Sequence, residues 1–446
     1  MNPLLKTLLL SFMLSTTISA CSSSDDSSDN NEQTEQSDDN SGSTDNGSDD
    51  SSDDSSDGNT ENPDTALFNA WVINNTGERS SQITESDGVT MALINVQSVS
   101  AETNSGATYA LVTATGIPKY DVTITEEIYD DLVNRPLADD DFFNGLPTVS
   151  VGDVVEFGQN IGYDTFGPCQ NSAGEGYWPP SLQCPEVMDK AGYFPAEPEP
   201  TDEACDTGLG VNGYWVNGTS VYNWGDGQSY NNEQTWWNLA PVAEQYDVDI
   251  CGGHSAQGDY HHHFYSSCLA DLVGDQGDGH SPIYGYAADG YPIYGPWEAQ
   301  GQLAVSSWVV RDYSANSDTG CDDGQRSCTL VDPYDVAQGT TSSNVGPDLD
   351  AAVTTMSGNP LNAYNGYYRE DYYWDSGLTA QGAPFLDQYN GHSDDTRGYH
   401  YHVTVTEENG KLIPYYPFTV GNRYAGKLAD NAVSSCSGQG GGGPRP

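Results

Sequence analysis

The chain has 446 residues, and 66 acidic side chains against 13 Lys and Arg give it a formal net charge of −53. A surface of this charge repels the phosphates of nucleic acids and anionic lipid headgroups, so we expect neither as a partner. A saline habitat and the binding of divalent cations would each suit the same charge.

The first twenty residues, Met1–Ala20, are predicted to be a signal peptide. They carry one cation, Lys6, and then an apolar run from Leu8 to Leu14. Such a run is too short to span a bilayer as a permanent helix, and it is typical of an export signal that is later removed. We therefore predict an exported protein.

The signal ends in Ile18-Ser19-Ala20-Cys21, which resembles the lipobox at which bacterial lipoproteins are acylated on the cysteine and cleaved in front of it. We predict lipidation of Cys21, which makes a membrane the anchoring partner. An ordinary secretory signal with an incidental cysteine is the alternative. Ser22 follows in place of Asp, and by analogy with Gram-negative sorting this favours the outer membrane or the cell surface.

Residues 22–64 contain fifteen acids, no Lys or Arg and no large apolar residue. Such a segment buries too little apolar surface to offset its chain entropy, so we predict a disordered spacer that follows the lipidated cysteine. The Gly-rich and Pro-rich tail, 437–446, is predicted to be disordered as well.

Short β-branched runs bounded by Gly, Pro, Asn or Asp predict strands after the spacer. These runs are 91–96, 109–113, 149–151, 154–157 and 308–310. The fold class is therefore mainly β, rich in loops and disulfides. We expect one large domain over 65–436, with an N-terminal sub-sheet at 65–160 and a core at 210–420.

Helix signals are few. Thr123 followed three residues later by Glu126 resembles a capping box and predicts a helix that continues to Val133. A second helix is predicted from Asp348 to Met356, before Gly358 and Pro360.

Eight cysteines remain besides Cys21, an even number that predicts four disulfides in an exported chain. The sequence allows 105 pairings, and the short separations favour Cys321 with Cys328 and Cys251 with Cys268. A thiolate metal site is the alternative, although the chain has no CxxC pair.

The eight histidines all lie from residue 254 onward, and six of them fall in two copies of one motif. Each copy has an Asp, three residues, Gly-His-Ser, a short loop and Tyr-His-x-His. The copies place the upstream histidines at His254 and His392 and the His-x-His pairs at His261/His263 and His400/His402.

The His-x-His spacing indicates a shared face, because residues two apart in a strand point the same way. His262 then faces away. With His254 or His392 as a third ligand, each copy suits Zn²⁺ or Cu²⁺, and Asp249 and Asp387 are candidates to orient the rings from behind. Two tri-histidine sites and one shared site are both open, and we favour one composite site. Hydrogen-bonded core histidines are the alternative to metal.

Between the copies lie His280 and two Pro-Ile-Tyr-Gly units that flank Asp289-Gly290, a turn signal. A structural hairpin is the simpler interpretation. His280 and Asp289 are nevertheless candidates for proton transfer beside a metal site.

The tetrapeptide Tyr399-His400-Tyr401-His402, the upstream Gly391-His392 and the segment 289–295 closely resemble the YHYH-domain family of bacterial exported proteins and lipoproteins. The resemblance covers residues 210–420, and it implies a grouping and no activity. This chain departs from the family in two places. The first copy reads Tyr-His-His-His, and Tyr389 stands where such proteins often carry a cysteine, which implies no disulfide at the second copy and leaves Cys251 to pair elsewhere.

Three functions follow as hypotheses. The first is a surface lipoprotein that captures or buffers copper or zinc. The second is a metal-dependent enzyme, oxidative with copper or hydrolytic with zinc, acting on a small molecule. The third is a structural or adhesive surface protein without metal. The chain has no nucleophile elbow, HExxH, P-loop or dinucleotide fingerprint, so no named enzyme class is supported.

Overall fold

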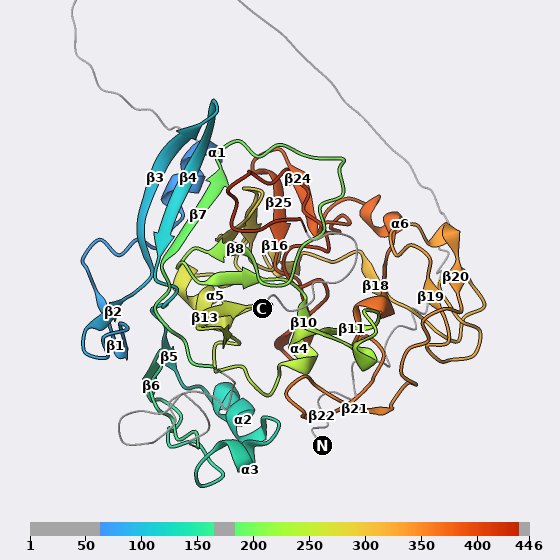
Figure 1. Ribbon diagram of the computed structural model, residues 1–446, viewed down its shortest axis with the longest axis horizontal. Coiled ribbons are helices and arrows are strands. Elements are labelled where there is room, and N and C mark those ends of the chain that lie inside the picture. Colours follow the sequence, from blue (N-terminus) through green and yellow to red (C-terminus); the bar gives the residue numbers. More distant parts are fainter. Residues whose placement is uncertain (1–62, 165–182, 437–446) are drawn as a thin grey trace, which may run out of the picture. The chain divides into compact units, whose positions relative to one another are not determined.

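The structure, a computed structural model, describes residues 63–164 and 183–436. The predicted signal peptide, Cys21, Cys169, the spacer up to residue 62 and the tail 437–446 lie outside these ranges. Within them the chain is β-rich, with many short strands and a few short helices (Figure 1), which confirms the predicted fold class.

A three-stranded antiparallel sheet forms the N-terminal part, in the order β3 (Val96–Asn104), β4 (Ala107–Ala114) and β7 (Lys190–Pro195). Alternate residues of β4 from Ala110 to Ala114 are buried, because one face of this strand packs on the core. The third strand comes from beyond residue 160, so this sheet extends past the end expected for the N-terminal sub-sheet.

Shorter elements surround this sheet. They are α1 (Pro63–Asn69), β1 (Arg79–Thr84), β2 (Met91–Leu93), β5 (Asp121–Thr123), α2 (Glu126–Asn134), α3 (Ala138–Asp141) and β6 (Val154–Glu156). Strands β1 and β2 form one antiparallel pair, and β5 and β6 form another. Helix α1 begins at Pro63, so the last two residues of the expected spacer belong to a helix.

Three local predictions in this part were wrong in detail. Thr125, and not Thr123, caps α2, because its side chain accepts a hydrogen bond from Ile128 N. The strand expected at 91–96 is broken at Asn95, whose φ of 61° is left-handed. The strand expected at 149–151 is absent, and Val151 lies in a turn.

An eight-stranded mixed sheet is the centre of the fold, in the order β12-β13-β9-β8-β14-β15-β25-β24. The outer strands of its first half are β12 (His254–Ala256) and β13 (Asp259–His262), and the inner ones are β9 (Ser220–Tyr222) and β8 (Val211–Trp215). The second half repeats this layout with β14 (Ile283–Ala287), β15 (Pro292–Tyr294), β25 (Gly398–His402) and β24 (Gly391–Asp394). Strands β13 and β9 are parallel, and so are β25 and β15. The sheet therefore consists of two repeats, each with one histidine motif at its outer edge.

The repeats join through their central strands, β8 and β14, which pair antiparallel. A Cβ on Gly213 would lie 2.3 Å from Tyr286 O, and one on Gly285 would lie 2.6 Å from Tyr214 O. Glycine at these two equivalent positions therefore permits the close approach of the two halves. The dipeptide Gly-Tyr begins at Gly213 and occurs again 72 residues later at Gly285. The strands that contain it, β8 and β14, have the same spacing.

Long connections between and after these strands hold the remaining elements. They are β10 (Gly225–Ser229), η2 (Tyr230–Asn232), β11 (Trp237–Leu239), α4 (Ala240–Ala243), α5 (Ser267–Val273), β16 (Trp297–Ala299), β17 (Gln302–Leu303), β18 (Trp308–Val310), β19 (Thr329–Leu330), η3 (Val336–Gln338), β20 (Thr340–Thr341), β21 (Ala352–Thr354), β22 (Pro360–Asn362), η4 (Arg369–Asp371), β23 (Tyr372–Trp374), α6 (Ser376–Thr379), β26 (Val405–Glu408) and β27 (Lys411–Pro414). The expected strand at 308–310 is β18. The helix expected at 348–356 was wrong: Asp350 has a φ of 65°, and β21 pairs with β22 instead.

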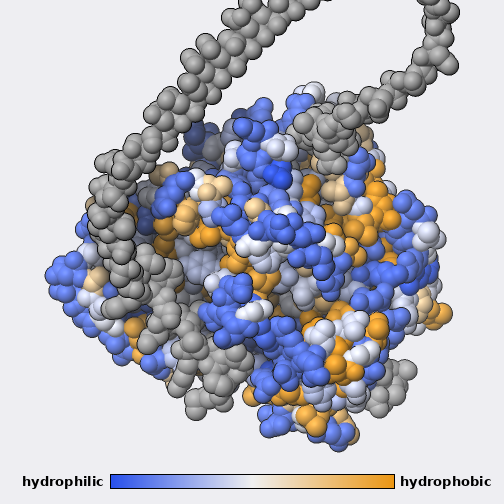
Figure 2. All heavy atoms as spheres, turned by 180° about the vertical axis from the view of Figure 1, so that it is seen from behind, coloured by the Kyte–Doolittle hydropathy of each residue, from blue (hydrophilic) through white to orange (hydrophobic). Residues whose placement is uncertain are grey.

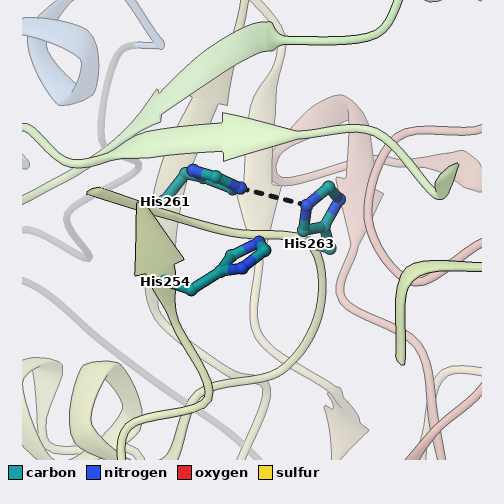
Figure 3. A group of neighbouring side chains, drawn as sticks. All are labelled: His254, His261 and His263. Atoms are coloured by element: carbon teal, nitrogen blue, oxygen red, sulfur yellow. Dashed lines mark hydrogen bonds between the residues drawn. The ribbon is translucent and has the colours of Figure 1, made fainter. Parts of the chain in front are cut away.

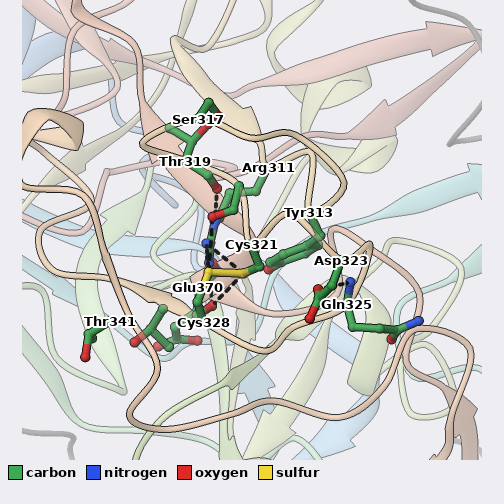
Figure 4. Close-up of a disulfide and its surroundings, with 12 residues drawn as sticks. Arg311, Tyr313, Ser317, Thr319, Cys321, Asp323, Gln325, Cys328, Thr341 and Glu370 are labelled. Carbon is green, nitrogen blue, oxygen red and sulfur yellow. Dashed lines mark hydrogen bonds between the residues drawn. A yellow bond between two sulfur atoms is a disulfide. The ribbon is translucent and has the colours of Figure 1, made fainter.

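Disulfide bonds crosslink several of these connecting segments. The predicted Cys251–Cys268 and Cys321–Cys328 bonds are confirmed, and Cys205 is bonded to Cys436. Figure 4 shows the Cys321–Cys328 bond beside Arg311, whose Nη2 lies 3.3 Å from Cys328 Sγ. Cys184 is also disulfide-bonded. These seven cysteines are therefore not thiolate ligands.

A buried ion pair connects the N-terminal sheet to the large sheet. Lys190 Nζ on β7 lies 2.9 Å from Asp259 Oδ1 on β13, and both side chains are at most 10% exposed. Ser220 Oγ donates to the other carboxylate oxygen at 2.7 Å. The ammonium also lies over the ring of Tyr214, 4.7 Å from its centroid.

Hydrophilic residues cover most of the face in Figure 2, with hydrophobic patches scattered between them. None of the helices in the described ranges combines the length and the apolarity that a membrane crossing requires.

Candidate metal centres

Two β-hairpins, at opposite edges of the eight-stranded sheet, carry the histidine motifs. In β12–β13 His254 pairs across the strands with His261, and in β24–β25 His392 pairs with His400. The strand assignment is confirmed for Tyr399–His402 and for Tyr260–His262, whereas His263 lies one residue beyond the end of β13. The two histidines of each His-x-His pair point to the same face, and the upstream histidine lies opposite the first of them. Each hairpin therefore presents three imidazoles on one side.

The glycine before each upstream histidine leaves room for a tyrosine ring. A Cβ on Gly253 would lie 2.3 Å from Tyr260 Oη, and one on Gly391 would lie 2.6 Å from Tyr399 Oη. The Gly-His dipeptide and the Tyr-His dipeptide of each copy thus pack against each other, which explains why both occur in the motif.

We call the first cluster centre 1; it consists of His254, His261, His263 and Glu244. The three rings point toward one another (Figure 3), and each offers one nitrogen within 4.8 Å of the other two. His261 Nε2 lies 3.1 Å from His263 Nε2.

The hydrogen bonds behind these rings fix where their protons lie. His261 Nδ1 contacts Asp259 O, and His263 Nδ1 contacts Asn223 O. A carbonyl oxygen only accepts hydrogen bonds, so both Nδ1 atoms must carry the proton, and a neutral imidazole has only one. Both Nε2 atoms are then bare lone pairs that face each other, an arrangement that a bound cation would stabilise.

Glu244 completes centre 1. Its Oε2 lies 3.1 Å from His263 Nε2 and 3.3 Å from His254 Nε2. Burial raises the pKa of Glu244 to about 7 and lowers the pKa of His254 to about 4, because neither charged form is solvated there. Three imidazoles and a carboxylate are a ligand set that suits Zn²⁺ or Cu²⁺.

We call the second cluster centre 2; it consists of His280, His392, His400, His402 and Glu298. His392 Nε2 lies 3.1 Å from His400 Nε2 and 3.1 Å from Glu298 Oε2, which is itself 3.6 Å from His402 Nε2. Ligand atoms of His280, His400 and His402 also converge within 4.8 Å.

The rings of centre 2 are held as those of centre 1 are. His400 Nδ1 contacts Gly398 O, and His402 Nδ1 contacts Gly295 O, which corresponds to Asn223 in the first repeat. His280 Nδ1 contacts Ser281 O. These three rings therefore present three bare Nε2 lone pairs to one another. Burial lowers the pKa of all three, so the rings are neutral.

Buried atoms without hydrogen-bond partners gather at both centres. They include Nε2 of His254, His280 and His402 and Oε2 of Glu244 and Glu298. Apart from the imidazole–carboxylate contacts within each centre, these buried atoms have no partner, which costs free energy, and one metal ion at each centre would satisfy them. The residues present therefore fit a transition metal.

The single composite site favoured on sequence was wrong. Each cluster draws its motif histidines from one copy, and the two hairpins are separated by the four other strands of the sheet, β9, β8, β14 and β15. The physical reason is that the repeats meet through β8 and β14, which leaves the motif hairpins at the two outer edges.

The aspartates expected to orient the rings hold the hairpin loops instead. Asp249 Oδ1 accepts hydrogen bonds from Cys251 N and Gly253 N, and Tyr260 Oη donates to its carboxylate at 3.1 Å. Asp387 does the same with Tyr389 N, Gly391 N and Tyr399 Oη. Backbone carbonyls orient the rings.

The structure assigns different places to the other residues that the sequence singled out. His262 faces away, as expected, and its Nε2 lies 3.3 Å from Tyr260 Oη. Asp289 accepts a hydrogen bond from Tyr401 Oη at 2.6 Å and does not contact the imidazoles. His280 joins centre 2, so the structure gives it a place that the sequence left open. Glu244 and Glu298 belong to no motif, and the sequence carried no signal for either.

The fold and its sites thus define a class: a β-rich domain built from two repeats, each with a histidine-bearing hairpin. The family model described as YHYH protein matches residues 192–410, so this part of the chain is a YHYH domain. Comparison with curated proteins and with solved structures found no match.

Proposed function

We propose that this protein is an exported lipoprotein, anchored through Cys21 at the outer membrane or cell surface, that binds copper or zinc at centres 1 and 2. Its role is the capture or buffering of the metal outside the cell. The bare, converging Nε2 lone pairs of the rings whose Nδ1 atoms contact carbonyls are the observation that carries this proposal; the rings are those of His261, His263, His280, His400 and His402. The net charge of −53 supports it, since such a surface concentrates cations.

A metal-dependent enzyme is the second candidate, and one observation favours it. His254, His261 and His263 line a pocket of about 330 Å³, so a metal at centre 1 would be reachable by a small molecule. A metal there would supply Lewis acidity or redox chemistry, and Glu244 is placed to accept a proton. A purely structural role is less favourable, because it leaves lone pairs facing each other.

Elemental analysis of the purified full-length protein tests the proposal. We expect two copper or zinc ions per chain, and one each in the His261→Ala/His263→Ala and His400→Ala/His402→Ala variants. His262→Gln is the matched control, since His262 lies between two proposed ligands and faces away; it should keep both ions. Less than one ion per chain under metal-replete conditions would refute the proposal, and so would an equal loss in the control.

A further inference from the structure

The two centres differ in what surrounds them. Centre 1 lies on the wall of the 330 Å³ pocket, which is also lined by Leu209, Tyr222 and Met356. Gly213 and Gly285 are equivalent positions in the two repeats. Five residues before them stand Gly208 in the first repeat and His280 in the second, so these two positions correspond. A glycine therefore stands where centre 2 has its fourth imidazole, and its neighbour Leu209 lines the open space.

The pocket of centre 1 is acidic. Asp226 and Asp247 line it together with Glu244, and no Lys or Arg is among the described residues that do so. Burial and the nearby Glu244 raise the pKa of Asp226 to about 8, so this carboxyl is largely protonated without a bound cation, and a cationic group placed beside it would favour its ionised form. Burial raises the pKa of Asp247, although His254 and Arg135 act in the opposite direction, and Arg135 is itself paired with Asp141 at 2.8 Å.

Unused hydrogen-bonding atoms also line this pocket. Ser255 is 6% exposed, and its Oγ has no hydrogen-bond partner. Gln183 Oε1 is likewise buried and has no hydrogen-bond partner. The pocket therefore combines acceptor atoms, carboxyl groups that a bound cation would ionise, and an approach to the metal ligands.

Centre 2 has the opposite character. Its fourth imidazole, His280, has a ring centroid 5.5 Å from that of His400 and 5.1 Å from that of His402. A cation, Arg397, acts on Glu298 and pairs with Asp394. Two overlapping groups of ligand atoms, His280/His400/His402 and Glu298/His392/His402, converge there, so His280 can fill the coordination position that an outside ligand would take.

We propose that centre 1 takes an exchangeable ligand which coordinates the metal through a neutral donor and places a cationic group, such as an ammonium, among Asp226, Asp247 and Ser255, whereas His280 closes centre 2. This inference rests on the proposed function, since it requires metal at both centres.

The test uses full-length protein loaded with Cu²⁺ and three probes that share one donor and differ in charge: 4-methylimidazole, histamine and imidazole-4-acetate. The His400→Ala/His402→Ala variant isolates centre 1, and the His261→Ala/His263→Ala variant isolates centre 2. Ligand exchange is followed by the visible absorption and electron paramagnetic resonance of the copper, and the near-ultraviolet circular dichroism confirms that each variant is folded.

We expect centre 1 to bind histamine at least tenfold more tightly than imidazole-4-acetate, with 4-methylimidazole between them. Asp226→Asn and Asp247→Asn should each reduce that preference at least threefold, which separates recognition by the pocket from simple chelation by histamine. Centre 2 should not respond to 4-methylimidazole until His280→Ala is added to its variant.

Equal affinities for the three probes, a preference untouched by both Asp variants, or an equal response of centre 2 would each overturn the inference and leave the proposed function standing. Absence of copper from both centres would instead refute the proposed function, and this inference with it.

Discussion

At the scale of single residues, backbone carbonyls decide the chemistry of the imidazoles. Asn223, Asp259, Gly295 and Gly398 each accept a hydrogen bond from an Nδ1 atom and so turn a bare Nε2 toward a centre. A metal-ligating histidine needs this ring orientation, because the hydrogen-bond partner of one ring nitrogen holds the proton there and leaves the other nitrogen unprotonated. No side-chain pattern in the sequence reports it.

Asp289 offers a test of pH dependence away from the imidazoles. It accepts hydrogen bonds from Tyr401 Oη, Gly426 N and Tyr291 N, and burial nevertheless raises its pKa to about 6. Because the folded protein holds this proton more tightly than the unfolded chain, the group contributes stability below pH 4 that is lost as the pH rises through 6.

Asp289→Asn removes this titration, and an amide NH₂ in place of Oδ2 would face two hydrogen-bond donors, Tyr401 Oη and Gly426 N. We expect the variant to be less stable than the wild type at pH 4.5, and the difference to shrink by about 2 kcal/mol at pH 7. Urea unfolding of both proteins without metal at the two pH values measures it. A difference that stays constant or grows with pH would show that Asp289 is ionised throughout.

At the scale of elements, the hairpins were predictable and their partners were not. The His-x-His period and the following β-branched residues indicated strands, and β13 and β25 are strands. Thr123 was predicted as a helix cap because Glu126 follows it three residues later, whereas Thr125, the actual cap, is followed there by Ile128. Only the pairing of β5 with β6 assigns Thr123 to a strand. Glu244 lies ten residues before His254, whereas Glu298 lies 94 residues before His392, so the repeated motif carries no information about either carboxylate.

The Lys190–Asp259 pair tests the contact between two sheets. Lys190→Met leaves a buried carboxylate with Ser220 as its remaining side-chain partner, which should lower the free energy of unfolding by about 3–5 kcal/mol. Lys427→Met is the matched control, since the Lys427–Glu199 pair is more than half exposed and should change stability by less than about 1 kcal/mol.

The double variant Lys190→Met/Asp259→Leu distinguishes a buried charge from lost packing. It should recover most of the loss, because it leaves no uncompensated charge. Denaturant unfolding of the three variants measures these values. If the double variant is as unstable as Lys190→Met, the ammonium stabilises the junction mainly through the ring of Tyr214.

At the scale of the whole molecule, the duplication determines the number of centres. The sequence showed two copies of the motif, but it could not show whether the repeats meet at their histidines or at their other edges. The glycines of β8 and β14 allow the second arrangement, because each lies too close to the opposite backbone for any side chain. The correction from one site to two is therefore a consequence of strand order, which local patterns do not encode.

Two centres in one continuous sheet should stabilise the same folding unit independently. Each bound ion adds about 2.7 kcal/mol when free metal is a hundredfold above its dissociation constant, and sites without shared ligands add their effects. Chelation should therefore lower the thermal midpoint of the wild type, and each single-centre variant should show part of that shift. The two partial shifts should sum to the whole when calorimetry is carried out at equal metal excess. A sum well below the wild-type shift would mean that the centres are coupled across β8 and β14, and a shift confined to one variant would mean that only one centre binds metal.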